Sequence, residues 1–273
     1  MNYTPEQTAD FHQHSLALVR IKEQDHVLRI RLNRPGKKNA LNRTLLWELA
    51  FALHYARHNN EVWAVVLEAE GDVFCSGADL KGLMGGGLEG GSTIPTPKGE
   101  VLLAELFRNL HRPCIAQVEG DVLAGGMLLL TGCTHVVASN DIHLALPEVK
   151  RGLFPFQVLA ALLEVMPARQ AVDWCLRGYP LDAEQACELG LITQVCIREQ
   201  IRQEVNALLK SLLANSPSAI RLGLEAYAQL KDEHAQERHQ YLMGMLMKTM
   251  QTQDAREGIA AFKEKRDPVW KGS

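Results

Sequence analysis

The sequence predicts a mixed α/β fold, in which a β-rich core of roughly 200 residues is followed by a helical region of about 75 residues. Two observations predict this order. In the first half, short apolar runs typical of strands alternate with segments whose apolar residues recur at helical spacing. From Gln157 onward the pattern is almost entirely helical, apart from one short strand near 191–197. We therefore expect a core over 1–200 and a helical region over 201–273.

The N-terminal part predicts two strands and a helix. Segments 16–21 and 26–32 are apolar runs, and in the second run leucines and an isoleucine alternate with two arginines, which predicts one buried and one exposed face. The Asn-Arg-Pro-Gly sequence at 33–36 supplies the turn after it. Asn42 is expected to cap a helix, because the apolar residues after it recur at helical spacing. Those residues are Leu45, Leu46, Leu49 and Leu53.

The middle of the chain predicts further strands around a glycine-rich loop. Segment 63–67 is continuously apolar, as in strands that are buried on both faces. From Gly82 to Gly99 the composition changes to Gly, Ser, Thr and Pro, which predicts a mobile surface loop near the site. The elements expected after it are a helix over 101–110, a strand over 114–118, a helix opened by Gly125 and Gly126, and strands over 135–139 and 143–146.

Single residues mark the helix starts of the second half. Pro167 and Pro217 are expected at or near first turns, and Asp182 is expected to be an N-cap. Apolar residues between Tyr241 and Met250 recur at helical spacing, a pattern compatible with a face that packs between subunits. The helical region is therefore a candidate for subunit contacts.

Composition and charge exclude several classes of protein. The chain has 273 residues, of which 47% are hydrophobic and 22% charged, a mixture too apolar for intrinsic disorder. The longest mostly apolar run, 122–130, is about half as long as a membrane-spanning helix. A net charge of −3 creates no global field for nucleic acid or for an anionic lipid surface. We expect neither nucleic acid nor a membrane as a partner.

Cysteines and histidines give no metal or disulfide pattern. No two cysteines have CxxC spacing, and no HExxH sequence occurs among the histidines, so we expect no metal. The first residues lack the charged and apolar regions of a signal peptide. We therefore expect a cytoplasmic protein with reduced thiols. The cysteines are Cys75, Cys114, Cys133, Cys175, Cys187 and Cys196.

Three features are candidates for chemistry. The segments 76–79 and 123–127 place small residues where a strand gives way to a helix, and exposed backbone N–H groups there can hold the oxygen of a polarised carbonyl. Either segment is also typical of a simple tight turn. Glu148 follows an expected strand among apolar residues, where desolvation favours acid–base chemistry, although a surface ion pair with Lys150 or Arg151 is the alternative. The apolar neighbours are Leu144, Leu146, Val149 and Leu153.

Taken together, the segments resemble the enoyl-CoA hydratase/isomerase (crotonase) family. The resemblance extends from about residue 16 to residue 270, with the matching segments in the family's order and spacing. It implies a crotonase-like superhelix of ββα units with a C-terminal helical oligomerisation region, assembled as a homotrimer or a dimer of trimers. The matching segments are 32–35, 39–42, 74–81, 113–116, Gly120, 125–126, 146–149, 152–153, 181–191 and 257–266.

The resemblance also implies the roles of individual residues. The substrate is an acyl-CoA thioester, and no separate cofactor is implied. The N–H groups of Ala78 and Gly125 bind the thioester oxygen and stabilise an enolate, and Glu148 acts as acid and base. Phe262 and Lys265 match tail residues that reach the nucleotide of a neighbouring subunit. The positions that line the substrate or the CoA are Lys38, Ala40, Ala78, Asp79, Leu80, Lys81, Gly125, Leu128, Phe262 and Lys265.

Leu128 is the main departure from the family pattern. The family's hydratases use two glutamates twenty residues apart, and Leu128 occupies the position of the first. Because leucine accepts no proton, a single-glutamate hydratase is expected to be ~10²–10⁴-fold slower. A double-bond shift needs only one base, so Glu148 alone is sufficient for isomerisation. Glu119 and Asp121 are candidates for a substitute acid, with a turn carboxylate as the simpler interpretation.

Other functions stay open beside this one. Loss of the first glutamate favours a non-catalytic acyl-CoA-binding protein, whereas the presence of Ala78, Gly125 and Glu148 opposes it. Decarboxylation and thioester hydrolysis are further chemistries of the same family. A serine hydrolase that uses Ser76 lacks the GxSxG context. Phenylalanines at 154 and 156 are expected to narrow the acyl pocket.

Overall fold

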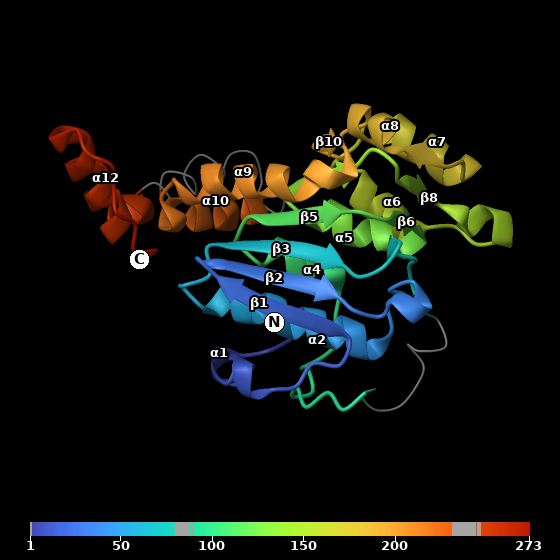
Figure 1. Ribbon diagram of the computed structural model, residues 1–273, viewed down its shortest axis with the longest axis horizontal. Coiled ribbons are helices and arrows are strands. Elements are labelled where there is room, and N and C mark those ends of the chain that lie inside the picture. The colour runs from blue at the N-terminus through green and yellow to red at the C-terminus, as the bar shows by residue number, and fades with distance from the viewer. Residues whose placement is uncertain (1, 80–87, 89, 231–243, 245–246) are drawn as a thin grey trace.

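Two β-sheets form the centre of the molecule, and helices cover both faces of the larger sheet (Figure 1). The computed structural model describes residues 2–79, 88, 90–230, 244 and 247–273, without the side chains of Arg151 and Phe262. The larger sheet has the strand order β1-β2-β3-β5-β7-β10 and the smaller one the order β4-β6-β8-β9. Within the larger sheet only β1 and β2 pair antiparallel.

The described strands are short, and most begin within three residues of their predicted positions. In the larger sheet they are β1 (Val19–Gln24), β2 (Val27–Leu32), β3 (Ala64–Ala69), β5 (Cys114–Val118), β7 (His135–Ser139) and β10 (Gln194–Cys196). In the smaller sheet they are β4 (Val73–Cys75), β6 (Asp121–Leu123), β8 (His143–Ala145) and β9 (Leu181–Asp182). The strands β4, β6 and β9, of two or three residues each, were not expected from the sequence, whereas the equally short β8 and β10 were expected as parts of the longer segments 143–146 and 191–197.

Helices connect the strands and fill the second half of the described chain. They are α1 (Pro5–Ala9), α2 (Arg43–His58), α4 (Leu103–Arg108), α5 (Met127–Gly132), α6 (Phe156–Leu162), α7 (Ala168–Arg177), α8 (Ala183–Glu188), α9 (Ile201–Leu213), α10 (Pro217–Leu230) and α12 (Gln253–Glu264). The short 3-10 turns are η1 (Phe11–Gln13), η2 (Pro35–Lys37), η3 (Ala124–Gly126), η4 (Pro147–Arg151) and η5 (Arg198–Gln200). None of the described helices is long and apolar enough to cross a membrane.

The predicted pattern of β2 is confirmed, and its reason is visible in the packing. Leu28, Ile30 and Leu32 are fully buried beneath the sheet. The two arginines face the other way, and the buried carboxylate of Glu68 on β3 lies 2.6 Å from Arg29 and 2.7 Å from a second arginine, Arg31. One buried carboxylate on β3 thus stabilises two cations that stand on the same face of the neighbouring strand β2.

Two helices cover the large sheet from opposite sides. On one side α2 packs against β1 and β2, and its start is confirmed: the Asn42 side chain accepts a hydrogen bond of 2.9 Å from the Leu45 amide. On the other side α9 packs on β3, β5 and β7 through Val205 and Leu209. Beyond α10, α12 projects away from the body as an arm (Figure 1). The Asp182 N-cap is confirmed as well, with a complete capping box.

Buried histidines predict a specific dependence of stability on pH. His54 on α2 is 4% exposed, and burial, helped by nearby His58 and Arg57, lowers its pKa to about 4. As the pH falls from about 6.5 toward 4, His54 therefore binds a proton in the unfolded chain but not in the folded chain. Because the folded-state pKa is lowered, stability is full above about pH 6.5 and falls with acid, by about 3 kcal/mol for this residue.

Denaturant unfolding at several pH values between 7 and 4 tests this expectation. The free energy of unfolding of the His54→Gln variant is expected to fall less steeply with acid than that of the wild-type protein. Equal slopes for the two proteins contradict the assignment to His54.

Candidate active site

The candidate site lies where three neighbouring strands of the smaller sheet end. The strands β4, β6 and β8 are parallel neighbours, so their carboxyl ends meet at one edge of the sheet. Each is followed within three residues by one predicted group: Ala78 after β4, Gly125 after β6 and Glu148 after β8. Ligands of parallel sheets bind at such carboxyl ends. Since strands are about 4.8 Å apart, the outer two groups leave the sheet about 10 Å from each other.

A bridge to Leu41 orients the Ala78 amide. The Leu41 amide donates to the Gly77 carbonyl at 2.8 Å, and the Asp79 amide donates to the Leu41 carbonyl at 3.0 Å. Peptide groups in extended chain alternate in direction, so the N–H of Ala78 faces away from Leu41, toward the neighbouring strand β6. Ala78 itself is exposed.

The Gly125 amide lies directly beside that of Ala78. An ideal Cβ built on Gly125 would be 3.6 Å from the Ala78 nitrogen, and one built on Gly77 would be 2.9 Å from the Gly125 nitrogen. Gly77 is left-handed with φ of 92°, so a side chain is excluded there both by conformation and by space. Among the described backbone hydrogen bonds outside helices and strands, none has the Ala78 amide as its donor.

Strained backbone supports this arrangement. Ala124, the residue before Gly125, has φ of 52°, in the left-handed region where a residue with a Cβ costs about 1–2 kcal/mol. Its Cβ packs against Gly77, and Gly126 behind it sits so close to the Cys75 carbonyl oxygen that an added Cβ would lie at 2.7 Å. The two loops are thus packed into one rigid unit.

Glu148 stands on η4 at the end of β8. The residue is half-buried, and its Oε2 atom is fully shielded from solvent. On its inner side lies Cys175 of α7, whose pKa is raised to about 11 by burial and by the negative charge of Glu148. The end of α7 packs on the chain just before the glutamate, because Gly178 approaches the Leu146 carbonyl closely. The expectation that Leu153 shields Glu148 is wrong, since this leucine is 57% exposed.

Leu128 lies one turn into the helical segment that begins beside Gly125. It is half-buried and packs against the main hydrophobic core. The expected pair of phenylalanines behaves differently: Phe154 packs against the core, but Phe156 is 75% exposed. The centres of the two rings are 4.9 Å apart, and the exposure of Phe156 does not support the expectation that it narrows an acyl pocket.

Lys38, Ala40 and Asp79 lie near the extended segment 76–79 that contains Ala78. Lys38 is exposed, and its carbonyl accepts from the Ser76 amide at 3.0 Å. The carbonyl of Ala40 accepts from Arg34 at 3.0 Å, and the same Arg34 atom lies 2.8 Å from the Asp79 carboxylate. The Asp79 side chain is thus engaged with the protein itself. Leu80 and Lys81 lie outside the described residues, as do residues 82–87 and 89 of the glycine-rich loop and residues 241–243, 245 and 246 of the 241–250 stripe.

The tail residues are not brought to the site within one chain. Phe262 belongs to α12 and Lys265 follows it, exposed, with φ of 55°. In Figure 1 the arm that carries them leaves the body at the end opposite α5, α6 and β8. A role for them at a CoA nucleotide requires a second subunit.

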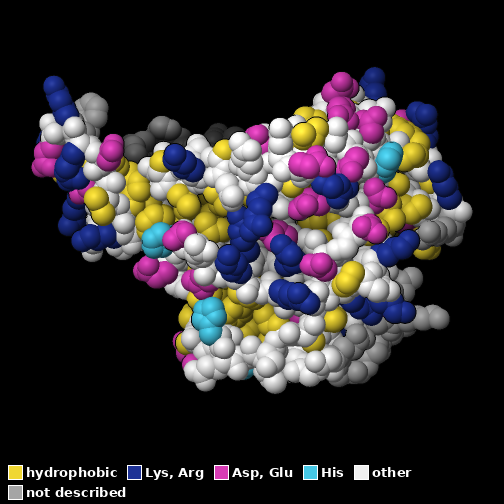
Figure 2. Space-filling model, in the orientation of Figure 1, with side chains coloured by type: hydrophobic (Ala, Val, Ile, Leu, Met, Phe, Trp, Pro, Cys, Tyr) yellow, Lys and Arg dark blue, Asp and Glu magenta, His cyan; other side chains and the backbone are white. Residues whose placement is uncertain are grey.

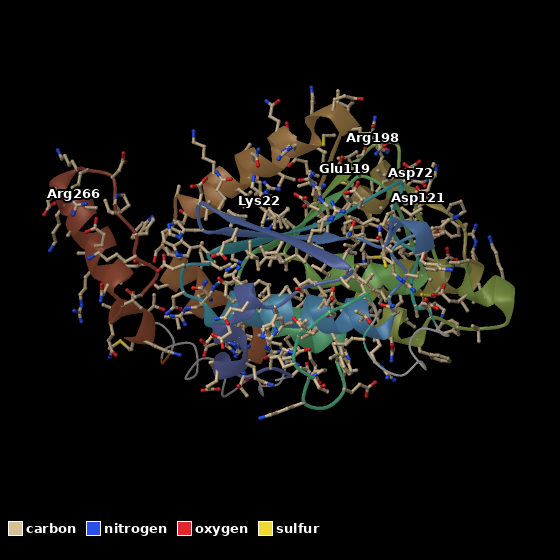
Figure 3. All side chains as sticks on the ribbon, turned by 60° about the horizontal axis from the view of Figure 1, so that its bottom comes forward. Lys22, Asp72, Glu119, Asp121, Arg198 and Arg266 are labelled. Atoms are coloured by element: carbon tan, nitrogen blue, oxygen red, sulfur yellow. The ribbon has the colours of Figure 1, made fainter. Side chains whose placement is uncertain are left out.

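The two substitute acids considered from the sequence lie in a surface charge cluster. Asp121 begins β6, at the end opposite Gly125, and accepts from the His143 amide at 2.8 Å. The Glu119 carboxylate accepts from Gln117 at 2.6 Å. Figure 3 shows both residues beside Asp72 and Arg198. Within the described ranges, no group of three His, Cys, Asp or Glu side chains is placed to hold a metal ion.

A model of the enoyl-CoA hydratase/isomerase family matches residues 22–273. The chain belongs to this family. A mitochondrial enoyl-CoA hydratase domain-containing protein 3 from Rattus norvegicus is 30% identical over 254 residues, covering 93% of this chain and 84% of the relative. The carnitinyl-CoA dehydratase of Escherichia coli strain K12 is 30% identical, covering 90% of this chain and 95% of the enzyme.

Solved structures of the enoyl-CoA hydratase/isomerase family agree with the fold. The enoyl-CoA hydratase of Mycobacterium tuberculosis H37Rv has 31% identity and a TM-score of 0.82, covering 94% of this chain and 100% of that one. An enoyl-CoA hydratase/isomerase of Mycobacterium paratuberculosis has 28% identity and a TM-score of 0.83, covering 95% of this chain and 100% of that one. The predicted family and crotonase-like fold are confirmed. The roles of single residues stay predictions.

Proposed function

We propose that this protein is an acyl-CoA enzyme of the hydratase/isomerase type, with Glu148 as its single acid–base residue. In this proposal the amides of Ala78 and Gly125 form an oxyanion hole for the thioester oxygen. The observation that carries it is the convergence of these three groups at the ends of β4, β6 and β8. Relatives with enoyl-CoA hydratase and carnitinyl-CoA dehydratase in their names support an acyl-CoA substrate.

The chemistry follows from the two kinds of group. Two N–H donors aimed at the thioester oxygen stabilise the negative charge that develops there as an enolate forms, and each such donor typically contributes about 3–4 kcal/mol. A carboxylate removes a proton from one carbon, the electron pair moves through the enolate, and the same carboxyl group returns the proton to another carbon. The net result is a shifted double bond, with no second carboxylate needed.

Leu128 makes hydration the weaker reaction in this proposal. Addition of water requires that the water is deprotonated while the neighbouring carbon is protonated, and two carboxylates usually share this work. A half-buried leucine at the first position supplies neither donor nor acceptor. The same observation favours a second candidate, an acyl-CoA-binding protein without turnover. Decarboxylation and thioester hydrolysis use the same oxyanion hole and are the remaining alternatives.

The wider expectations belong to the same proposal. Lys38, Ala40 and the segment from Ala78 to Lys81 line the CoA, with Phe262 and Lys265 contributed by a neighbouring subunit of a homotrimer or a dimer of trimers. Hydrophobic side chains exposed near the base of the arm support subunit contacts (Figure 2), and Ile259 on α12 is 51% exposed. Six free cysteines support a cytoplasmic location.

Purified protein assayed with a 3-enoyl-CoA and with crotonyl-CoA tests the function. Isomerisation of the 3-enoyl-CoA is expected to be faster than hydration of crotonyl-CoA. Turnover of neither compound, together with tight binding of both by calorimetry, contradicts the enzyme and supports the binding protein.

A carboxylate introduced at position 128 is expected to increase hydration. Leu128→Glu is expected to raise the hydration rate of crotonyl-CoA about 10²-fold, because a positioned acid–base group contributes ~10²–10⁴-fold. Leu128→Gln is the matched control, with the same length but no proton acceptor of comparable basicity, and is expected to hydrate no faster than the wild-type protein. Equal rates for the two variants contradict the assignment of Leu128 to the acid–base position.

A further inference from the structure

Arg34 and Asp79 form an ion pair beside the candidate oxyanion hole. Nη1 of Arg34 lies 2.8 Å from Oδ2 of Asp79 and donates to the Ala40 carbonyl at 3.0 Å. The pair is largely shielded from water, with 11% of the arginine side chain and 24% of the aspartate side chain exposed. Asp79 directly follows Ala78. The ion pair therefore fixes the chain one residue from the amide that is proposed to bind the thioester oxygen.

The Asn39 side chain fixes the backbone of Arg34 to the body of the protein. Its side chain is fully buried and accepts from the Arg34 amide at 2.8 Å. The same side chain donates to the carbonyls of Glu70 at 2.9 Å and Val73 at 2.8 Å, which flank the turn between β3 and β4. The Asn39 side chain thus holds the backbone of Arg34 against the turn between β3 and β4. A buried, fully bonded amide of this kind moves little.

We propose that Arg34 is a positioning residue, which sets the Ala78 amide against the Gly125 amide through Asp79. The inference rests on the proposed function and deepens it. Two donors serve one oxygen only when both are held within about 0.5 Å of the correct positions. Ala78 is exposed, and its neighbours are held by the backbone bridge to Leu41, to which the ion pair with Asp79 adds a side-chain anchor. Arg34 supplies this anchor without touching the substrate.

The inference also changes the role of Asp79. From the sequence this residue is a CoA-lining position, but its carboxylate is engaged with Arg34. Paired in this way, it holds the backbone that approaches the thioester, and its own side chain makes no contact with the CoA.

Binding of a thioester and of its thioether counterpart separates positioning from general stability. Butyryl-CoA has the carbonyl and S-butyl-CoA lacks it, so the ratio of their affinities measures the two amide hydrogen bonds alone. The wild-type protein is expected to bind butyryl-CoA about tenfold more tightly. In Arg34→Met the ratio is expected to fall at least about fivefold while S-butyl-CoA binds as before. Asp79→Asn is expected to lower the ratio too, and the double variant to lower it no further.

Arg29→Met is the matched control, because it breaks an equally shielded ion pair, with Glu68, on the face of the larger sheet. Its affinity ratio is expected to equal that of the wild-type protein. An unchanged ratio in both Arg34→Met and Asp79→Asn overturns the inference, as does an equal loss of affinity for both ligands. A wild-type ratio near one contradicts the proposed function itself, and the positioning role falls with it. Should Arg34→Met fail to fold, Asp79→Asn decides alone.

Discussion

Replacement of Glu148 by glutamine is expected to lower isomerisation of a 3-enoyl-CoA by ~10²–10⁴-fold with little effect on substrate binding. Glutamine keeps the size of the side chain and its place at the end of β8, but its amide does not accept a proton at neutral pH. Since Leu128 offers no second group, no residue of the described site replaces the lost base. The measurement is kcat and KM for the wild-type and variant proteins, with denaturant unfolding to show equal stability.

Glu119→Gln serves as the control for this prediction. Glu119 is the other glutamate that the sequence offers as an acid, but it lies in the surface cluster with Arg198 and Asp72 (Figure 3). Its variant is expected to turn over like the wild-type protein. Full activity of Glu148→Gln, or a loss in Glu119→Gln of the same size, contradicts the assignment of the base.

A methyl group at Gly125 is expected to lower turnover by ~10²-fold or more while the protein stays folded. The Gly125→Ala side chain meets its nearest atoms at 3.6 Å or more, an ordinary contact, and Gly125 is not in the left-handed region. The nearest of these atoms is the Ala78 nitrogen, so the methyl group takes space that the thioester oxygen needs. The variant thus removes the oxyanion hole without a buried clash.

Alanine variants of two further glycines provide comparisons for Gly125→Ala. Gly126→Ala places its Cβ 2.7 Å from the Cys75 carbonyl oxygen and is expected to reduce stability as well as turnover. Gly223→Ala on α10 has open space around it and is expected to change neither. Unfolding curves and steady-state rates for the three variants provide the comparison. Wild-type turnover in Gly125→Ala shows that the substrate oxygen does not lie between the two amides.

The sequence allowed the prediction of elements whose local chemistry decides them. The alternation of β2, the Asn42 cap of α2 and the Asp182 cap of α8 each depend on a few consecutive residues, and each is confirmed. The position of Glu148 after a strand was also predictable, because it closely follows the apolar run 143–146. For Ala78 and Gly125 the small residues were predictable, but the short strands β4 and β6 before them were not. Their meeting at one sheet edge depends on the parallel order of β4, β6 and β8, which no single segment contains.

The parts that were missed are those that depend on distant contacts. Arg34 is read from the sequence as part of a turn, and only the fold brings it 2.8 Å from Asp79, forty-five residues later. The left-handed conformation of Ala124 has no local signal, since it results from packing against Gly77. Leu153 belongs to the apolar run around Glu148 and was expected to shield it, but the chain turns at Gly152 and leaves the leucine in solvent.

The central claim is that two main-chain amides hold a thioester oxygen while one carboxylate faces the adjacent carbon. A crystal structure with a bound, unreactive acyl-CoA analogue tests it most directly. The account predicts the carbonyl oxygen about 2.7–3.1 Å from both the Ala78 and Gly125 nitrogens, with a Glu148 oxygen about 3–3.5 Å from the α-carbon. A carbonyl oxygen bound away from both amides, or Glu148 turned to bulk water with the acyl chain elsewhere, would contradict it.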